Sequence, residues 1–217
     1  MSVVKDYAAA VSSAQGERPI KRRMRAPARR AEVLGAAVEC FARSGYRATS
    51  MGEIAARADV ARPVLYDHFP SKKALFLEVL EEQSAAFLAD AASRISGEGD
   101  ARERMRQTVA AVFAFAHERP DSWRLLFGNT AHGDPEIDAA AAAAHRNRVV
   151  AVAALLAEDA RNAGIDPAGP RAEAMVEMLI AALRGGAEWG LARPGVARED
   201  LVEAALDLLW TGLGNLR

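Results

Sequence analysis

Residues 29–80 carry the pattern that most limits what this chain can fold into. Three short helical segments, with a tight turn between the second and third, are followed at once by a longer helix. In the first segment, Leu34, Val38 and Phe41 have the i, i+4, i+7 spacing of a single buried face. Gly45 then marks the helix end, where glycine commonly takes a left-handed conformation. The segment therefore predicts a small helical unit with its own core.

The second helical segment begins with a helix-start signal and ends in a turn. Ser50 and Glu53 have the spacing of a capping box, in which each side chain satisfies a free backbone N–H of the other. The turn contains Asp59, one of the few non-glycine residue types that tolerate a positive φ. We expect Val60 to fill the space beneath this turn.

The third segment, from Arg62 to Phe69, predicts a short helix with two different faces. Leu65 and Phe69 can point inward, which leaves Arg62, Pro63 and Tyr66 outside. Three small helices packed in this way present one helix to the major groove of DNA. The pattern therefore favours a DNA-binding module.

The start of the next helix is a candidate phosphate site. Ser71 can cap it, and Lys72 and Lys73 lie in its first turn. Free backbone N–H groups, the helix dipole and two ammonium groups together favour an anion.

The run GYRATSMGEIAARADVARPVLYDHFPSKKALF (residues 45–76) resembles the N-terminal domain of the TetR/AcrR family of transcriptional regulators, over about a quarter of the chain. The resemblance implies an all-α protein of about nine helices. In it, an N-terminal helix-turn-helix domain is joined by the fourth helix to a larger helical ligand-binding and dimerisation domain. It implies that Arg47 approaches the minor groove, that Thr49 or Ser50 donates to phosphate, and that Lys72 contacts the DNA backbone. The recognition helix would carry Arg62, Pro63, Tyr66 and His68.

Three residues depart from the family pattern. Asp59 replaces the usual turn glycine, Ala61 stands where a serine or threonine often caps the recognition helix, and Val64 stands where a threonine often contacts phosphate. Loss of the cap costs up to about 1 kcal/mol. The departures bear on base readout more than on the fold.

Charge is unevenly distributed although the net charge is only −1. Residues 1–73 hold 14 Lys/Arg and 7 Asp/Glu, whereas residues 74–217 hold 14 and 22. A basic head on an acidic body is typical of a DNA-binding protein. We divide the chain into a disordered basic leader (1–26), a helix-turn-helix domain (27–73) and an effector-binding and dimerisation domain (74–217). The basic run 18–30 is either an arm that adds salt-dependent DNA affinity or a solvated leader.

Other features limit compartment and chemistry. Cys40 is the only cysteine, which fits a reducing cytoplasm, and its position on the first helix favours a buried thiol. The chain has neither an apolar run long enough to span a membrane nor the apolar core of a signal peptide. The four histidines form no metal-ligand pattern and no hydrolase or nucleotide-binding motif occurs, so we expect no catalytic residue, metal or cofactor.

The rest of the chain predicts helices only, separated by caps, glycines and prolines. Asp134-Pro135, for example, is a favourable helix start, and the alanine run 139–144 favours helix. The expected helices cover residues 71–95, 100–120, 121–128, 134–162, 170–190 and 198–213.

One cluster in this region is a candidate effector site. It combines aromatic side chains with a few polar ones, as a pocket for an apolar ligand with a polar head would. A filled core with surface histidines explains the same residues, and the resemblance favours the cavity: Met105, Phe113, His117, Trp123, Phe127, His145 and Arg148.

A second cluster is a candidate dimer interface. The last two expected helices carry apolar residues on more than one side, and the glycines at 185 and 186 would allow close approach of another helix. Burial within one subunit is the alternative. The interface residues would be Met178, Ala182, Gly186, Trp189, Leu206, Leu209, Trp210 and Leu213.

The resemblance thus implies a cytoplasmic homodimer that binds a palindromic DNA operator. It would be a repressor released by a small apolar or amphipathic effector that shifts the fourth helix. A non-specific nucleoid-associated protein that uses only the basic arm is the main alternative, and a helical enzyme is a further one. The sequence identifies neither the effector nor the operator.

Overall fold

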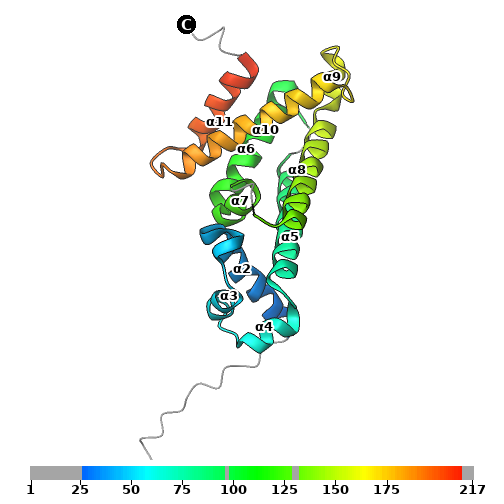
Figure 1. The fold of residues 1–217 in the computed structure, drawn as a ribbon. Helices are drawn as coiled ribbons and strands as arrows, with labels where there is room; N and C mark the ends of the chain where they lie inside the picture. Colours follow the sequence, from blue (N-terminus) through cyan, green and yellow to red (C-terminus); the bar gives the residue numbers. More distant parts are fainter. Residues whose placement is uncertain (1–25, 96–97, 129–131, 212–217) are drawn as a thin grey trace, which may run out of the picture. The chain divides into compact units, whose positions relative to one another are not determined.

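The computed structural model describes residues 26–95, 98–128 and 132–211, and these form ten α-helices, one π-helical turn and no strand (Figure 1). The chain divides into two compact units, of which the first ends at Ala31 and the second begins at Glu32. The expected leader lies mostly outside the described residues. The elements are α2 (Ala26–Ala48), α3 (Met51–Arg57), α4 (Arg62–His68), α5 (Lys72–Arg94), α6 (Ala101–Glu118), α7 (Pro120–Phe127), α8 (Pro135–Leu155), α9 (Ala157–Asn162), α10 (Pro170–Leu191), α11 (Arg198–Leu206) and η1 (Asp207–Thr211).

The helix-turn-helix unit contains the helix break, the cap, the turn and the buried leucine that its sequence predicts. Gly45 interrupts α2 with a φ of 73°. The Ser50 hydroxyl accepts a hydrogen bond from the Glu53 N–H at the start of α3, and Asp59 takes a φ of 53° in the turn before α4. Leu65 of α4 is fully buried. These local predictions are confirmed, except that the Glu53 carboxylate pairs with an arginine of α2.

α5 links this unit to the remaining helices. It contacts α6, α7 and α8, and in Figure 1 it runs beside α8. Near its first turns, Phe76 packs edge-on against Phe41 and Tyr46 of α2. The other side of Phe76 meets His132, whose ring centroid lies 5.2 Å away. The start of α5 therefore touches both the DNA-binding unit and the segment before α8.

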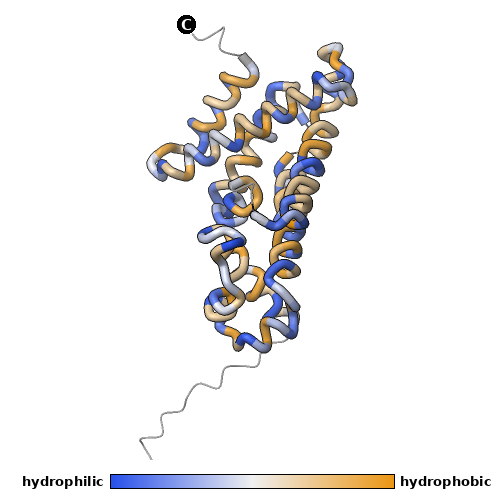
Figure 2. The backbone as a smooth tube through the Cα atoms, in the orientation of Figure 1, coloured by the Kyte–Doolittle hydropathy of each residue, from blue (hydrophilic) through white to orange (hydrophobic). Residues whose placement is uncertain are grey.

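The larger core is built around α6, which contacts α5, α10 and α11. In Figure 2 hydrophobic and hydrophilic residues alternate along these helices, as expected for one buried face per helix. Phe87 of α5 packs edge-on against Phe115 and Phe127, and Trp123 stacks on Phe127. α7 thus presents its aromatic side chains to the centre of the bundle.

Three details of the expected helices are wrong. The helix predicted over 134–162 is two helices, because Leu156 leaves helical geometry with φ −94° and ψ 0°. The last helix turns into a π-helix at Asp207. The helix expected over 121–128 starts one residue earlier, at Pro120, and the carboxylate of Asp121 in its first turn pairs with Arg124.

Candidate DNA-binding and effector sites

The outer face of α4 carries the side chains expected to read DNA. Arg62, Pro63 and Tyr66 are exposed, with Tyr66 49% exposed, and His68 is partly exposed. Ala61 provides no side-chain cap, while Pro63 lies in the first turn, where the missing N–H costs nothing. α4 therefore presents a basic and aromatic surface.

Arg62 is held against α3 rather than extended into solvent. A Cβ at Gly52 would come within 2.8 Å of three atoms of the Arg62 guanidinium group. The missing side chain of Gly52 thus makes room for this guanidinium at the start of α3. Sequence reasoning missed Gly52, because nothing in its local pattern shows which side chain crosses it.

Thr49 does not belong to the exposed surface, which corrects the expected phosphate contact. Its side chain is 1% exposed. Its hydroxyl lies 2.8 Å from the Gly45 carbonyl and 3.1 Å from the Cys40 carbonyl, and donates toward these oxygens. Thr49 therefore closes the end of α2. Ser50 is exposed, and its hydroxyl oxygen accepts from the Glu53 N–H while its own proton can still be donated. The phosphate contact therefore remains a prediction for Ser50 alone.

The two lysines of α5 also bind the protein itself, and the phosphate contacts expected of them stay predictions. The Lys72 ammonium donates to the carbonyls of Tyr46, Arg47 and Thr49 at 2.8, 3.3 and 2.9 Å. It also lies over the Tyr46 ring. Three N–H groups are all that an ammonium can donate, so Lys72 stabilises the negative end of α2.

Lys73 pairs with the start of α8. Its ammonium lies 3.0 Å from Asp134 and 2.9 Å from Glu136, and these carboxylates raise its pKa to about 12 through hydrogen bonds. The side chain of exposed Arg47 passes close to Gly133 in the segment before α8. The expected minor-groove role of Arg47 stays a prediction.

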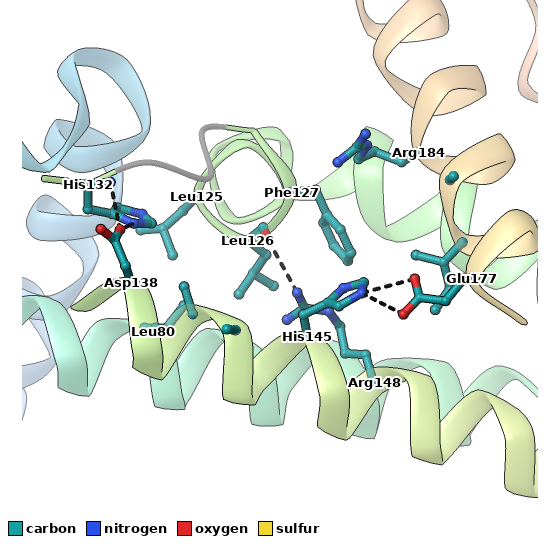
Figure 3. Close-up of a pocket in the computed structure, with 14 residues that line it drawn as sticks. Leu80, Leu125, Leu126, Phe127, His132, Asp138, His145, Arg148, Glu177 and Arg184 are labelled. Carbon is teal, nitrogen blue, oxygen red and sulfur yellow. Dashed lines mark hydrogen bonds and ion pairs between the residues drawn. The ribbon is translucent and has the colours of Figure 1, made fainter. Parts of the chain in front are cut away.

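A cavity of about 400 Å³ lies among α5, α7, α8 and α10 (Figure 3). Seven of its fourteen lining residues are aliphatic, and four of its polar side chains form two pairs. Asp138 accepts hydrogen bonds from the backbone N–H of His132 at 2.8 Å and binds the His132 ring at 3.0 Å. Nε2 of His145 lies 3.1 Å from both carboxylate oxygens of Glu177.

Arg148 is the buried charged side chain of this cavity, with an exposure of 5%. Its guanidinium lies over the Phe127 ring, and Nη2 makes one long contact of 3.5 Å with the Leu126 carbonyl. Nε and Nη1 have no hydrogen-bond partner among the described residues. Burial lowers the pKa of Arg148 to about 10, so the group stays charged at neutral pH.

Of the seven expected effector residues, Phe127, His145 and Arg148 line this cavity. Trp123 lines a smaller cavity of about 40 Å³, which shares Phe127 and Arg148 with the first. The remaining three do not line either one. His117 is exposed at the end of α6, Phe113 packs against Gly186, and Met105 lines a separate apolar groove near α9.

The sequence cluster also missed the α10 side of the cavity. Glu177, Ile180 and Arg184 line it and lie on one face of α10, at helical spacings of three and four. Because the apolar residues of this helix were interpreted as a dimer interface, its cavity-lining face was not predicted.

The expected dimer residues divide between surface and core. Exposed apolar side chains include Met178 at 63%, Trp189 at 47% and Trp210 at 46%. Leu206 is fully buried and Gly186 faces Phe113 of the same chain, so neither is available to a partner. Leu209 and Ala182 are half-buried, and Leu213 lies outside the described residues.

Neither a metal site nor a membrane-spanning helix occurs among the described residues. No group of three or more His, Cys, Asp or Glu side chains there could hold a metal ion. None of the described helices is long and apolar enough to cross a bilayer.

Comparison with known proteins gives consistent matches to one family. Residues 33–79 match the family model of bacterial regulatory proteins, tetR family. The HTH-type transcriptional activator FasR of Mycolicibacterium smegmatis is 33% identical over 190 residues, which cover 87% of this chain and 84% of FasR. The nucleoid occlusion factor SlmA of Marinobacter nauticus is 32% identical over 111 residues, covering 51% of this chain and 56% of SlmA.

Solved structures share the fold. A TetR-like transcriptional regulator from Rhodococcus sp. RHA1 has a TM-score of 0.70 at 24% identity, with 89% of this chain and 100% of that chain covered. FadR from Bacillus subtilis in complex with stearoyl-CoA has a TM-score of 0.71 at 17% identity, with 84% and 98% covered. The helix-turn-helix geometry and the FasR match over most of both chains lead to one conclusion: the chain belongs to the TetR family, and it is a DNA-binding transcriptional regulator rather than an enzyme.

Proposed function

We propose that this regulator acts as a homodimer in the cytoplasm and that a small molecule in the α5–α7–α8–α10 cavity controls its operator binding. The observation that carries this proposal is the position of His132 and Asp138. Both line the cavity, and His132 also packs against Phe76 of α5. A ligand in the cavity would therefore touch His132, which packs against a residue of α5 that contacts the DNA-binding unit.

The exposed face of α4 supports direct base contacts by Arg62 and Tyr66. Ser50 at the start of α3 is exposed and well placed in the sequence for a phosphate. One short helix contacts few base pairs, so useful specificity needs two heads spaced about 34–36 Å, one turn of DNA. This spacing requires a dimer.

A stripe of exposed and half-buried apolar residues on α10 supports the dimer proposal. Met175, Met178, Ala182, Gly185 and Trp189 follow spacings of three and four, so they share one face of the helix. Exposed apolar side chains of this size usually mark an interaction surface. Leu208 and Trp210 of η1, 47% and 46% exposed, add to the proposed interface.

Two contacts could carry a ligand effect to the DNA-binding unit. One is the packing of His132 on Phe76, and the other is the pairing of Lys73 with Asp134 at the start of α8. A ligand needs to favour one arrangement of α5 and α8 by only about 1–3 kcal/mol to change operator affinity. That FadR binds stearoyl-CoA within a similar fold supports a ligand role for this cavity.

The direction of regulation is a separate matter. The family resemblance favours a repressor released by its effector, whereas the relative FasR is named an activator. Ligand control of operator occupancy accounts for both outcomes, because the position of the operator relative to the promoter decides whether occupancy blocks or aids transcription.

Binding of the purified protein to DNA upstream of its own gene tests the proposal. The affinity would be measured with and without a panel of apolar acids, acyl thioesters, aromatic compounds and cationic drugs. We expect tight binding to one palindromic segment and a change of at least fivefold with one ligand class. Equal affinity for all DNA would support the nucleoid-associated alternative, and specific binding that no ligand changes would remove the effector role.

A further inference from the structure

We propose that the α5–α7–α8–α10 cavity binds a small organic acid, with its carboxylate against Arg148 and its aliphatic body in the larger part of the cavity. This proposal rests on the ligand control proposed above, since it names the chemical class of the ligand. It goes beyond that proposal in assigning the head group, its partner and its charge.

The guanidinium of Arg148 lacks the partners that a buried charge normally has. It is buried, yet its Nε and Nη1 atoms, which carry three N–H groups, have no hydrogen-bond partner among the described residues. The contact from Nη2 to the Leu126 carbonyl is long at 3.5 Å. Burial of an unpaired charge is unfavourable, and buried charges are generally paired. The site therefore calls for an anion.

The carboxylates that line the cavity do not supply this anion. Both oxygens of Glu177 face His145, and Asp138 binds the ring and backbone of His132. In Figure 3 the guanidinium of Arg148 lies beside His145, with one nitrogen toward the Leu126 carbonyl. The missing counter-charge can thus come from a bound ligand.

A carboxylate fits this position better than a dianion. Its two oxygens lie in one plane, as do the donors of a guanidinium, and one negative charge balances the one buried positive charge. A second negative charge would lie near Asp138 and Glu177, which line the same cavity. Arg184 lines it too, but its side chain is 44% exposed and lies 3.9 Å from Glu188, so it carries no buried, unpaired charge. The indole N–H of Trp123 is also buried without a partner among the described residues, in the smaller cavity that Arg148 also lines.

The remainder of the cavity suits a hydrocarbon. Its walls include Leu80, Leu125, Leu126 and Ile180, together with alanines of α8 and α10. Its volume of about 400 Å³ lies within the range of about 300–1,000 Å³ typical of small-molecule sites. The ligand is therefore an acid with an aliphatic body.

Isothermal titration calorimetry of the full-length protein with dodecanoate, dodecanol and dodecyltrimethylammonium tests the head group, because the three share one chain. Each compound is kept below its micelle concentration. Arg148→Met removes the charge at nearly constant volume. Arg146→Met is the matched control, since Arg146 lies two residues away on α8, is exposed and does not line the cavity.

We expect dodecanoate to bind the unaltered protein and R146M equally, and at least tenfold more weakly to R148M. Dodecanol should bind the unaltered protein at least tenfold more weakly than dodecanoate does. Equal binding of dodecanoate to R148M, equal binding of dodecanol, or no binding of dodecanoate would each overturn the proposal. The comparison of head groups needs no variant, so it decides the matter even if R148M does not fold.

The same samples separate this proposal from the proposed function. If dodecanoate binds through Arg148 but operator affinity is unchanged, the acid site stands and ligand control fails. If operator affinity responds to another ligand class while dodecanoate does not bind, ligand control stands and the acid site fails.

Discussion

Single side chains at the helix-turn-helix unit do different work from what their sequence positions suggest. Thr49 and Lys72 occupy positions at which the family pattern implies DNA contacts, yet both hold the end of α2. Their donors face backbone carbonyl groups near the end of α2, and a pattern of side chains does not show these contacts. By contrast, Arg62 and Tyr66 lie outside as expected, because their places follow from the inward positions of Leu65 and Phe69 on a short helix.

Gly52→Ala tests the placement of Arg62. A Cβ at this position would collide with the Arg62 guanidinium, so the arginine must move while the α3 backbone stays in place. Alanine favours helix over glycine by up to about 1 kcal/mol, and loss of one base contact costs about 1–3 kcal/mol of operator affinity. We therefore expect a raised melting temperature together with weaker operator binding in a fluorescence anisotropy titration.

Gly35→Ala is the control for this change. Gly35 lies within α2, and a Cβ there would have no neighbour within 4 Å. Its operator affinity should equal that of the unaltered protein. Unchanged affinity in G52A as well would show that the contact of Arg62 with Gly52 is irrelevant to DNA binding.

Arg62→Ala and Tyr66→Ala test the recognition surface. Each should weaken binding to the specific operator by about tenfold or more, as expected for one direct base contact, with little change in binding to unrelated DNA. Arg57→Ala removes one charge from α3, where Arg57 pairs with Glu39, and should leave the ratio of specific to non-specific affinity intact. Equal losses on all sequences would favour a protein without base readout.

The helices themselves were largely predictable, and their junctions were not. Caps and breakers at Ser50, Asp100 and Asp134 start helices as their sequences indicate. The break at Leu156 lies in a run of alanine and leucine without glycine or proline, so no local signal marks it. The cavity was half predictable: α7 and α8 residues were expected, whereas the α10 wall depends on how that helix rotates against its neighbours.

The start of α8 should show a defined pH dependence. Hydrogen bonds from Lys73 and then from backbone N–H groups lower the pKa of Asp134, and those from the backbone and ring of His132 lower the pKa of Asp138. A carboxyl whose pKa is lower in the folded state stabilises the fold above its unfolded pKa of about 4, and this contribution is lost as the pH falls through the folded value.

Asp134→Asn separates the charge from the cap, because asparagine also caps helices well. The melting temperature of D134N should lie below that of the unaltered protein at pH 7, and the difference should vanish well below pH 4. Glu81→Gln, an exposed change on α5, serves as the comparison. A difference for D134N that persists in acid would mean that the carboxylate does not act through Lys73.

At the scale of the whole molecule, the proposed dimer makes operator binding depend on the α10–η1 face. Met178→Glu places a charge in the centre of the exposed apolar stripe. We expect sedimentation velocity to report a monomer, with operator affinity reduced at least tenfold because one head binds alone.

Val150→Glu is the matched control for this prediction. Val150 is 68% exposed on α8 and does not belong to the stripe on α10, so its substitution should change neither the sedimentation coefficient nor DNA binding. A dimeric M178E protein with normal operator affinity would contradict the proposed interface.

The unpaired guanidinium of Arg148 also has an evolutionary consequence. Burial lowers the pKa of Arg148 to about 10, and a buried charge without a partner is destabilising, so an apolar residue at this position should give a more stable protein. Selection for stability alone would therefore favour replacement of Arg148. Lineages that keep the arginine must then be those in which the acid is still sensed, and relatives that sense neutral compounds should carry an aliphatic residue in its place.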